Sequence, residues 1–412
     1  MTFEVIKIDK WKSKEKIFRK LNKTTDKPFI IVCNIFRNIN KLFAKAVNIM
    51  ANKAYKFRLY PNKEQEIMFT KTFGCVRFIY NKMLADKIEY YKETKQKLNN
   101  TPAQYKKEFE WLKEVDSLAL ANAQMNLQTA YNNFFRTPKV GFPKFKSKKR
   151  NKNSYTTNNQ NGTVSIVDGK LKLPKIGLVK MKQHRFIPDE QKIKSATITK
   201  TPSGKYYVSI LVEYEQYIPD VQLDKNKALG LDYASHSFYV DSQGREADYP
   251  KFYRNAQNIL AKEQRKLSHM KYGSNNYQKQ KIKVARVHEH IANQRKDWIH
   301  KLSTSLANEY DYICVEDINM QNIAQSLNLG KSTNDNGFGM FRTILAYKLA
   351  DRGKKLIKID KWFPSSKRCR FCGAINKNLT LADRVWACEC GEVLNRDENA
   401  AINIRNVGLS MV

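Results

Sequence analysis

Hydrophobic and polar positions alternate in several short segments of the chain, and this alternation predicts β-strands. Residues 55–60 alternate apolar with more polar side chains and stop at Pro61, which is typical of a short strand. The same pattern predicts strands at 196–199 and 206–212, with a Pro-Ser-Gly turn between them. We therefore expect residues 163–215 to form a small β-barrel.

Helical periodicity replaces this alternation in two parts of the chain. Between residues 63 and 136, apolar side chains recur at helical spacing, and Asn62 followed by acidic residues predicts a helix start. A second long helical stretch, dense in Lys and Arg, is expected over 252–308. Both stretches predict helices that bury one apolar face.

Short apolar runs flank the second helical stretch and predict a separate sheet. They lie at 228–232, 238–244, 312–316 and 355–359. Because these strands are mixed with helices, we expect an α/β core. Three acidic residues lie at the ends of predicted elements in this part. Asp232 and Glu316 each end a predicted strand, and Asp397 lies where a helix is predicted to begin.

Charge changes the picture more than any other property of the composition. The 412 residues include 75 Lys or Arg against 39 Asp or Glu, a formal net charge of +36. Such an excess indicates a polyanionic partner, because a basic surface gains free energy when bound phosphates release their counterions. A basic ribosomal or surface protein from a genome rich in lysine codons is the alternative. The length predicts two or more domains.

The N-terminal segment differs from the rest of the chain. Residues 1–49 contain 12 Lys or Arg and 4 Asp or Glu, and Met50 precedes the first predicted strand. We therefore interpret 1–49 as a basic extension and Met50 as the natural start. The sequence contains neither a run of about 20 apolar residues nor an ordered signal peptide, so no membrane association is expected.

Four of the seven cysteines cluster near the C-terminus and predict a zinc site. Cys369 and Cys372 form one pair, Cys388 and Cys390 form another, and 15 residues separate the pairs. Four thiolates suit tetrahedral Zn²⁺ in a structural knuckle, although C-x-C departs from the usual C-x-x-C spacing. The knuckle precedes Asp397 by seven residues, so its folding and the placement of that carboxylate are expected to be coupled.

The acidic residues predict a site for hard divalent cations. Carboxylate oxygens are preferred ligands of Mg²⁺ and Mn²⁺, and two such ions can promote phosphodiester hydrolysis. Asp232, Glu316 and Asp397 are the candidates, but Asp241 and Asp317 compete for the same roles. Spacing alone does not choose between them.

From residue 50 onward, the sequence resembles the transposon-encoded TnpB family, the ancestors of type V CRISPR effectors. The resemblance is carried by motifs in a fixed order: FRLYP (57–61), FGCVRFIYN (73–81), AYNNFF (130–135), GFPKFK (141–146), LPKIG (173–177), GLD (230–232), VED (315–317), FPSSK (363–367) and RDENAA (396–401). Two features depart from the family pattern, namely the extension at 1–49 and the short tail of 15 residues after Asp397.

The resemblance implies a multidomain α/β protein with a RuvC, RNase H-like nuclease core. It implies catalytic roles for Asp232, Glu316 and Asp397 with Mg²⁺ or Mn²⁺. It further implies this division: extension 1–49, wedge 50–62 and 137–225 as a β-barrel, helical recognition domain 63–136, RuvC core 226–363 and 393–412, and a zinc-knuckle insert at 364–392 that binds the target nucleic acid.

The implied activity is cleavage of double-stranded DNA, beside a short motif, directed by a transposon-derived guide RNA. Guide pairing would read the sequence, while the protein reads backbone, shape and the adjacent motif. Basic, aromatic and polar residues predict nucleic-acid contacts at Lys56, Arg58, Tyr60, Arg77, Lys144, Lys146, Asn161 and Arg295. We expect the protein in the prokaryotic cytoplasm, associated with the nucleoid; a protein partner is not predicted.

Four other interpretations remain open at this stage. The chain could be an RNA-guided DNA-binding repressor without cleavage, although all three acids are present. It could be an accessory transposition protein or a DNA transposase in its own right, although no His-x-His pair with a nucleophilic tyrosine is evident. A CRISPR-associated effector would differ by its genomic neighbourhood rather than by its chemistry.

Overall fold

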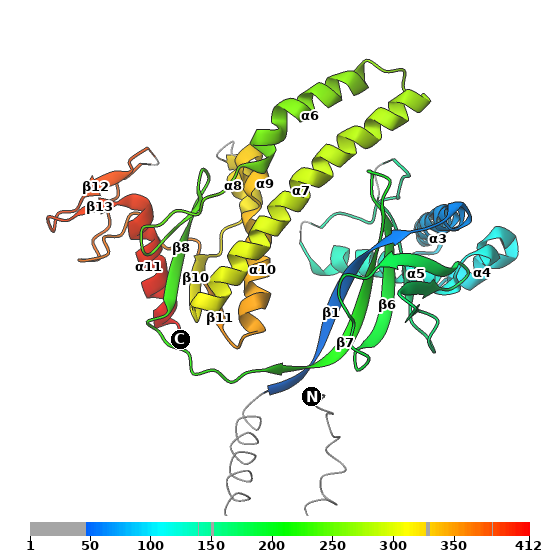
Figure 1. The fold of residues 1–412 in the computed structure, drawn as a ribbon, viewed down its shortest axis with the longest axis horizontal. Helices are drawn as coiled ribbons and strands as arrows, with labels where there is room; N and C mark the ends of the chain where they lie inside the picture. Colours follow the sequence, from blue (N-terminus) through cyan, green and yellow to red (C-terminus); the bar gives the residue numbers. More distant parts are fainter. Residues whose placement is uncertain (1–46, 139, 150–151, 327–329, 381) are drawn as a thin grey trace, which may run out of the picture.

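The computed structural model describes residues 47–138, 140–149, 152–326, 330–380 and 382–412. Its elements form a large antiparallel sheet, a helical module beside that sheet, and a second sheet enclosed by helices (Figure 1). This arrangement confirms the expected multidomain α/β class. Within the described residues, no helix is long and apolar enough to cross a membrane.

The large sheet has seven antiparallel strands in the order β2-β6-β7-β1-β5-β4-β3. Its strands are β1 (Val47–Tyr60), β2 (Asn153–Asn158), β3 (Ser165–Val167), β4 (Lys170–Leu173), β5 (Gly177–Lys182), β6 (Lys192–Lys200) and β7 (Tyr206–Ile218). As the alternation predicts, Tyr55, Phe57 and Leu59 of β1 are buried. The described strands leave β2 and β3 at opposite edges of this order, so closure into a barrel stays a prediction.

The first strand begins earlier than the sequence indicates. Val47, Asn48 and Ile49 belong to β1 and pair with Ile218, Tyr217 and Gln216 of β7. The expected boundary at Met50 therefore falls within a strand. Residues 1–46 of the expected extension lie outside the described part of the chain.

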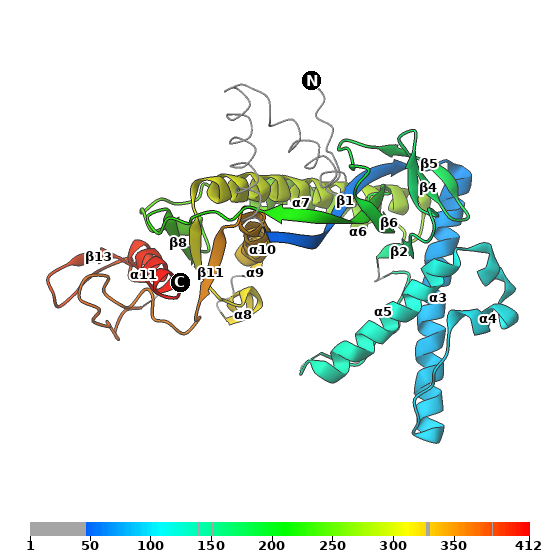
Figure 2. The ribbon, with the colours of Figure 1, turned by 90° about the horizontal axis from the view of Figure 1, so that it is seen from below.

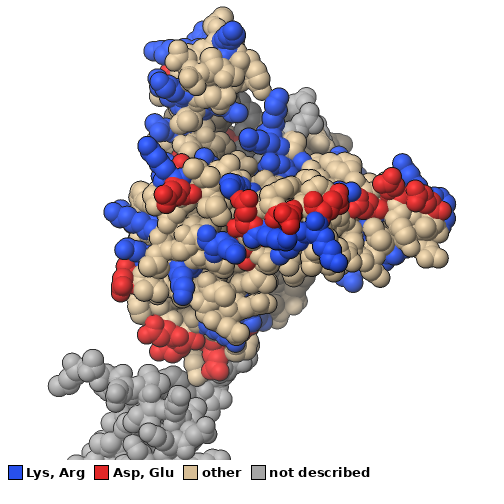
Figure 3. Space-filling view, turned by 90° about the vertical axis from the view of Figure 1, so that its right-hand side faces the viewer, with Lys and Arg blue, Asp and Glu red and all other residues tan. Residues whose placement is uncertain are grey.

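The helical prediction for 63–136 is confirmed. This module contains α3 (Lys63–Thr94), α4 (Pro102–Glu108), the 3₁₀ helix η2 (Glu110–Glu114) and α5 (Ser117–Arg136). Asn62 caps α3, because its Oδ1 accepts from the Gln65 N–H at 2.8 Å and Gln65 accepts from the Asn62 N–H at 3.1 Å. Figure 2 shows α3 and α5 projecting away from the sheet, and Figure 3 shows acidic and basic side chains interleaved on one face of the molecule.

The second sheet contains β8 (Ala228–Ala234), β9 (Phe238–Asp241), β10 (Tyr312–Glu316) and β11 (Lys355–Ile359) in the order β11-β10-β8-β9. The pairs β8–β10 and β10–β11 are parallel, and β9 is antiparallel to β8. Helices α7 (Asn275–Glu309) and α10 (Phe338–Ala350) pack on one face, and α11 (Arg396–Ser410) packs on the other (Figure 1). The four predicted strands are thus confirmed.

The helices of this part differ in detail from the prediction. The single stretch expected over 252–308 is two helices, α6 (Phe252–Ser268) and α7, because the chain turns at Gly273 with a φ of 83°. The sequence reading missed α8 (Met320–Ser326), α9 (Gly330–Asn336) and α10. It also missed the small hairpin of β12 (Val385–Ala387) and β13 (Val393–Asn395) that leads into α11.

Candidate active site and metal centre

The alternation of side chains along β8 places Asp232 on the side of the sheet that faces α11. Leu229 and Leu231 pack in the cluster shared with α7 and α10, whereas Ala228 packs in the cluster shared with α11. Successive side chains of a strand point to opposite faces, so Gly230 and Asp232 lie on the face of Ala228. Asp232 therefore lies on the side of the sheet that α11 covers.

Strand β10 brings Glu316 to the same face. Ile313 and Val315 pack toward α7 and α10, while Tyr312 and Cys314 pack toward α11. The parallel register pairs Leu231 of β8 with Val315 of β10. One step further along this register, Asp232 and Glu316 are neighbours on adjacent strands. Glu316 ends β10 as expected, whereas β8 continues two residues beyond Asp232, to Ala234, because these residues still pair with β9. Both acids lie toward the carboxyl ends of their strands, where sites of open α/β sheets form.

Two glycines allow α11 to approach the sheet closely. A Cβ at Gly230 would collide with the Ala401 carbonyl oxygen and lie 2.8 Å from the Arg405 backbone nitrogen. A Cβ at Gly408 of α11 would likewise collide with the thiol of Cys314. The close approach that these glycines permit brings the first turn of α11 beside Asp232 and Glu316.

Asp397 lies in that first turn and is held by two arginines. Asn395 caps α11, accepting through Oδ1 from the backbone N–H groups of Asp397 and Glu398. Arg396 donates from Nε to Asp397 Oδ1 at 2.9 Å, and Arg384 donates from Nη1 to Asp397 Oδ2 at 3.0 Å. Both carboxylate oxygens of Asp397 are therefore paired with cations of the chain itself.

Ionisation of the carboxyl groups of Asp232 and Glu316 is unfavourable in the absence of a bound cation. Burial raises the pKa of Asp232 well above its ordinary value, and the negative charges of Glu316 and Asp397 raise it further. Burial also raises the pKa of Glu316, against the opposing effect of a hydrogen bond donated by Ser365. A bound divalent cation would relieve this repulsion, so the donor set fits Mg²⁺ or Mn²⁺.

The carboxylate oxygens of Asp232, Glu316 and Asp397 nevertheless do not converge on one position. Within the residues described, the only set of three or more potential metal ligands whose ligand atoms all lie within 4.8 Å of one another is the four-cysteine cluster. The physical reason is that uncompensated carboxylates repel, and Asp397 is attracted by Arg384 and Arg396 instead. Binding of cations would require these oxygens to move closer together.

The competing acids have other partners. Asp241 is buried, accepts from the backbone of Gln243 and Arg245, and pairs with the Arg245 guanidinium at 2.8 Å, so it holds a turn. Asp317 follows Glu316 by one residue and therefore points to the other face, where Lys358 lies 3.1 Å away. Of the four acids compared on β8, on β9 and at the end of β10, Asp232 and Glu316 are the two that lie on the α11 face.

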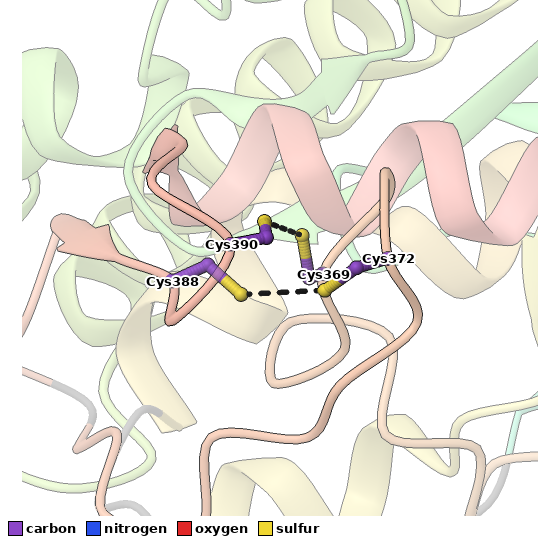
Figure 4. Close-up of side chains that lie close together, drawn as sticks. All are labelled: Cys369, Cys372, Cys388 and Cys390. Atoms are coloured by element: carbon purple, nitrogen blue, oxygen red, sulfur yellow. Dashed lines mark hydrogen bonds between the residues drawn. The ribbon is translucent and has the colours of Figure 1, made fainter.

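The four predicted cysteines converge in space (Figure 4). The Sγ atoms of Cys369 and Cys390 are 3.8 Å apart, and those of Cys372 and Cys388 are 3.5 Å apart. A tetrahedron with zinc–sulfur bonds of about 2.3 Å has edges of about 3.8 Å, so these distances suit Zn²⁺. The C-x-C spacing does not prevent the sulfurs from gathering.

The thiols differ in how readily they ionise. Burial raises the pKa of Cys369, but the backbone N–H groups of Cys372 and Phe371 outweigh it and lower that pKa to about 7. The backbone N–H of Cys390 lowers the pKa of Cys388, but burial and the neighbouring thiols raise it to about 12. A bound cation would favour deprotonation of the whole set.

The cysteine knuckle is tied directly to the helix that carries Asp397. Arg370, between the first two cysteines, donates from its backbone N–H to Asn399 Oδ1 at 3.0 Å and from Nη1 to Glu398 Oε1 at 2.8 Å. Asn403 of α11 donates to the Arg368 carbonyl oxygen at 2.6 Å. These bonds and the Arg384–Asp397 ion pair couple the position of Asp397 to the fold of the knuckle.

Three family models match separate parts of the chain. One described as a "Helix-turn-helix domain" matches residues 50–96, and one described as "Probable transposase" matches residues 209–327. The third, described as "Cas12f1-like, TNB domain", matches residues 338–404, which include the cysteine knuckle and Asp397.

Full-length relatives decide the family. A protein of Streptomyces pristinaespiralis named "Putative RNA-guided DNA endonuclease" is 35% identical over 368 residues, 87% of this chain and 90% of the relative. The chain belongs to the TnpB family. The Escherichia coli protein "Putative RNA-guided DNA endonuclease InsQ" is 30% identical over 86% of this chain and 92% of its own. A "TnpB-like protein L79" of Acanthamoeba polyphaga mimivirus is 32% identical over 31% of this chain and 25% of its own.

A solved structure shares the fold of this TnpB protein. It is titled "Cryo-EM structure of the Cas12f1-sgRNA-target DNA complex" and superimposes with a TM-score of 0.54 at 13% sequence identity. The match covers 87% of this chain and 99% of that one. At this level of identity the likeness concerns the fold alone.

The residues expected to contact nucleic acid in this TnpB protein divide into those that are exposed or partly buried without a described role and those that are engaged in contacts within the protein. Lys56 and Tyr60 are exposed on β1, with the partly buried Arg58 between them on the same face. Lys144 and Asn161 are exposed as well, and Arg77 is partly buried on α3. Their contact with nucleic acid stays a prediction.

Two of the expected contacts are engaged within the protein. Lys146 places Nζ 3.8 Å from the centre of the Tyr80 ring, and its backbone exchanges hydrogen bonds with Asn81. Arg295 lies 3.5 Å from the buried Asp335, not toward solvent. These contacts favour a packing role over the expected contact with nucleic acid for both residues.

Several side chains that support the site were missed by sequence reasoning. Arg384 and Ser365 contact the acids directly, and Asn399 and Asn403 fasten α11 to the knuckle. The order N-R-D-E-N-A-A-I-N was visible in the sequence, and its polar residues at helical spacing were the available signal for the two asparagines. No local sequence pattern identified Arg384, because its position beside Asp397 depends on the β12–β13 hairpin.

Proposed function

We propose that this TnpB protein is a guide-RNA-dependent DNA endonuclease with a RuvC-type site formed by Asp232, Glu316 and Asp397. The observation that carries this proposal is that Asp232 and Glu316, on adjacent parallel strands, lie on the sheet face that α11 covers. The names of the relatives from Streptomyces and Escherichia coli support the same activity.

Each acid would have a defined part in holding Mg²⁺ or Mn²⁺. Asp232 would be the central ligand, because it lies beside Glu316 of the adjacent strand and on the sheet face covered by α11, which carries Asp397. Ser365 orients Glu316, and Arg384 and Arg396 hold Asp397 until a cation competes for it. Two bound ions would supply charge stabilisation to the attacking and leaving oxygens of the phosphodiester.

The cysteine knuckle would be a structural zinc site. Cys369, Cys372, Cys388 and Cys390 would supply four sulfur ligands, leaving no open position for chemistry. Its role would be to fix Arg370 and Arg384 against α11 and thereby to place Asp397. Residues 364–392 would also contact the target nucleic acid.

The remaining parts would handle RNA and DNA. We assign 50–62 and 137–225 to a wedge domain, 63–136 to a recognition domain inserted in it, and 226–363 with 393–412 to the nuclease core. Pairing of β1 with β5 and β7 supports joining the first two segments across the helical insertion. A net charge of +36 and a fold shared with a protein solved with sgRNA and target DNA support both nucleic acids as partners.

One experiment tests this function. The protein is co-expressed with its own genomic flank, the co-purified RNA is sequenced, and its guide segment is reprogrammed against a plasmid library with a randomised adjacent motif. We expect Mg²⁺-dependent cutting only of plasmids with the matching target and a subset of motifs. Cutting without RNA, or RNA-dependent binding without any cutting, would contradict the proposal; the second outcome would indicate a repressor.

A further inference from the structure

Arg342 of α10 contacts the backbone at the end of β10, the strand that carries Glu316. It donates from Nη1 to the Glu316 carbonyl oxygen at 3.0 Å and from Nη2 to the Ile318 carbonyl oxygen at 2.8 Å. These two acceptors lie in the bend by which the chain leaves the second sheet after β10. Because a guanidinium is a planar fork of donors, this one side chain fixes both parts of the bend at once.

The Glu316 carbonyl oxygen lies where strand pairing ends. On the β11 side, the Asp317 N–H donates to the Ile359 carbonyl oxygen at 3.1 Å. In a trans peptide the carbonyl points away from the N–H, so the Glu316 carbonyl points toward the β8 side. The register of β10 with β8 ends one residue earlier, at Val315. Arg342 therefore supplies the donor that a longer strand pairing would have supplied.

The guanidinium of Arg342 is largely withdrawn from solvent and held against its own helix. Its side chain is 14% exposed, and its guanidinium carbon lies 5.8 Å from the centre of the Phe338 ring, one turn earlier. Its Nε has no hydrogen-bond partner among the described residues. A buried charge is costly unless hydrogen bonds replace its water, so the two bonds to the bend are what offset this burial.

The bend after Glu316 borders a cavity on one side. Residues 317–321 line this cavity of about 720 Å³, together with Arg342 and residues 358–361. Asp317 is exposed there, 3.1 Å from Lys358 and 3.8 Å from Arg342. Exposed ion pairs contribute little to stability, so the two carbonyl bonds of Arg342 hold the bend more firmly than Asp317 does.

Glu316 is restrained from both faces of the sheet. Ser365 donates to its carboxylate, which lies on the α11 face, and Arg342 donates to its carbonyl from α10, which packs on the opposite face. Glu316 is also the last residue of β10, and the ends of elements open most readily. Without Arg342, the peptide after Glu316 would be free to rotate and to turn the carboxylate away from Asp232.

We propose that Arg342 is a positioning residue: by fixing the backbone at Glu316, it holds the Glu316 carboxylate where a divalent cation binds. It acts through Glu316 and not on the reacting atoms. The inference rests on the proposed function for the role of Glu316 as a metal ligand. Groups that orient metal ligands from outside change metal affinity or activity by about 10–100-fold when they are removed.

The test compares three variants of the full chain. Arg342→Met removes the donors but keeps an unbranched side chain beside Phe338, and Arg342→Lys keeps the charge without the planar fork. Arg352→Met is the matched control, because Arg352 also donates to a backbone carbonyl, that of Lys348 at 2.8 Å, but beyond the other end of α10.

Three properties are measured for each variant. The first is the Mg²⁺ concentration that gives half-maximal RNA-guided cleavage. The second, which does not depend on activity, is the rise in melting temperature of the RNA-free protein when Mn²⁺ replaces EDTA. The third is the affinity for the co-purified RNA.

We expect Arg342→Met to need about tenfold more Mg²⁺ than Arg352→Met and to gain less melting temperature from Mn²⁺, with unchanged RNA affinity. Arg342→Lys should melt like the unmodified protein in EDTA and should need an intermediate Mg²⁺ concentration. This variant keeps the inference testable if Arg342→Met does not fold.

The inference would be overturned if Arg342→Lys and the control had the same Mg²⁺ requirement and the same response to Mn²⁺. A lower melting temperature of Arg342→Met in EDTA with unchanged responses to both metals would also overturn it, because Arg342 would then serve folding alone. If the unmodified protein showed neither Mg²⁺-dependent cleavage nor stabilisation by Mn²⁺, the proposed function itself would fail, so the two failures are distinguishable.

Discussion

Asp232 shows at the scale of one residue how burial opposes ionisation of a carboxyl group in the proposed metal site. Its carboxyl group is raised in pKa by burial and by two neighbouring carboxylates, so the folded chain holds its proton more tightly than the unfolded chain does. The metal-free protein should therefore lose stability as the pH rises from the ordinary aspartate range through the raised pKa of Asp232.

The first prediction concerns Asp232→Asn. The amide cannot ionise, so the variant should melt at a higher temperature than the unmodified protein in EDTA at pH 8, and the difference should shrink as the pH is lowered toward 4. RNA-guided cleavage should fall by roughly a hundredfold or more, since even outer-shell losses at metal sites cost 10–100-fold. Thermal melting in EDTA and a cleavage assay in Mg²⁺ check the two parts.

An Asn variant that melts lower at pH 8, or that cuts like the unmodified protein, would count against this account. Glu246→Gln offers a control, because this carboxyl lies near the site on the surface and pairs with His236 at 3.7 Å. That substitution should leave both measurements nearly unchanged.

How far the site could be read from the sequence depends on the residue. The period of two already separates Glu316 from Asp317, but which face carries the site depends on where α11 packs. Resemblance to the family indicated the three acids, whereas Arg384 depends on a hairpin with no clear alternation. The contact between Arg295 and Asp335 could not be read from the sequence, because the two residues are distant in the chain.

At the scale of elements, the contact between α11 and β8 is the decisive packing. Gly230 is required there because the Ala401 carbonyl oxygen occupies the place of a Cβ. We predict that Gly230→Ala forces α11 away from the sheet, destabilises the nuclease core by about 1–3 kcal/mol and abolishes cleavage. Denaturant unfolding and the cleavage assay measure these effects.

The control for this substitution is Gly74→Ala. Gly74 lies within α3, where an added Cβ meets nothing within 4 Å and the backbone conformation suits alanine. This change should stabilise the helix by about 0.5–1 kcal/mol and leave cleavage intact. If both variants behaved alike, the close approach of α11 would not be what places Asp397.

The knuckle gives a second prediction at this scale. Cys390→Ser should lower the zinc content of purified protein and reduce cleavage, because Arg370 and Arg384 would no longer hold the first turn of α11. Zinc is measured by metal analysis, and exposure of the knuckle by limited proteolysis. Cys75→Ala, at a buried thiol outside the cluster, should keep its zinc; a Cys390 variant that keeps zinc and activity would disprove the coupling.

Elements with a clear pattern of apolar and polar residues were predictable from the sequence, and elements without such a pattern were not. Strands β10 and β11 have the predicted ends, because short apolar runs there lie between polar turns. Helices α8 and α9 were missed since residues 319–337 are rich in Asn, Ser and Gly and carry little helical signal. The break between α6 and α7 lies at Gly273. It was not predicted, because the stretch around it is dense in charged residues.

At the scale of the whole molecule, two sheets with different tasks are joined through a long basic helix. Asp232 and Glu316 lie on the second sheet, while Lys56, Arg58 and Tyr60, the expected nucleic-acid contacts of β1, lie on the first. Helix α7 packs on the second sheet near its C-terminal end and meets the first sheet through Glu289. In the proposed function, α7 would therefore connect recognition of nucleic acid with its cleavage.

The most direct test of the central claim compares adjacent acids on opposite faces of β10. Glu316→Gln and Asp317→Asn are assayed side by side for RNA-guided cleavage in Mg²⁺ and for binding of the co-purified RNA. We predict that Glu316→Gln binds RNA normally but loses cleavage by roughly a hundredfold or more, whereas Asp317→Asn retains both. Retained cleavage in the Glu316 variant, or its loss in the Asp317 variant alone, would contradict the assignment of the site to the α11 face.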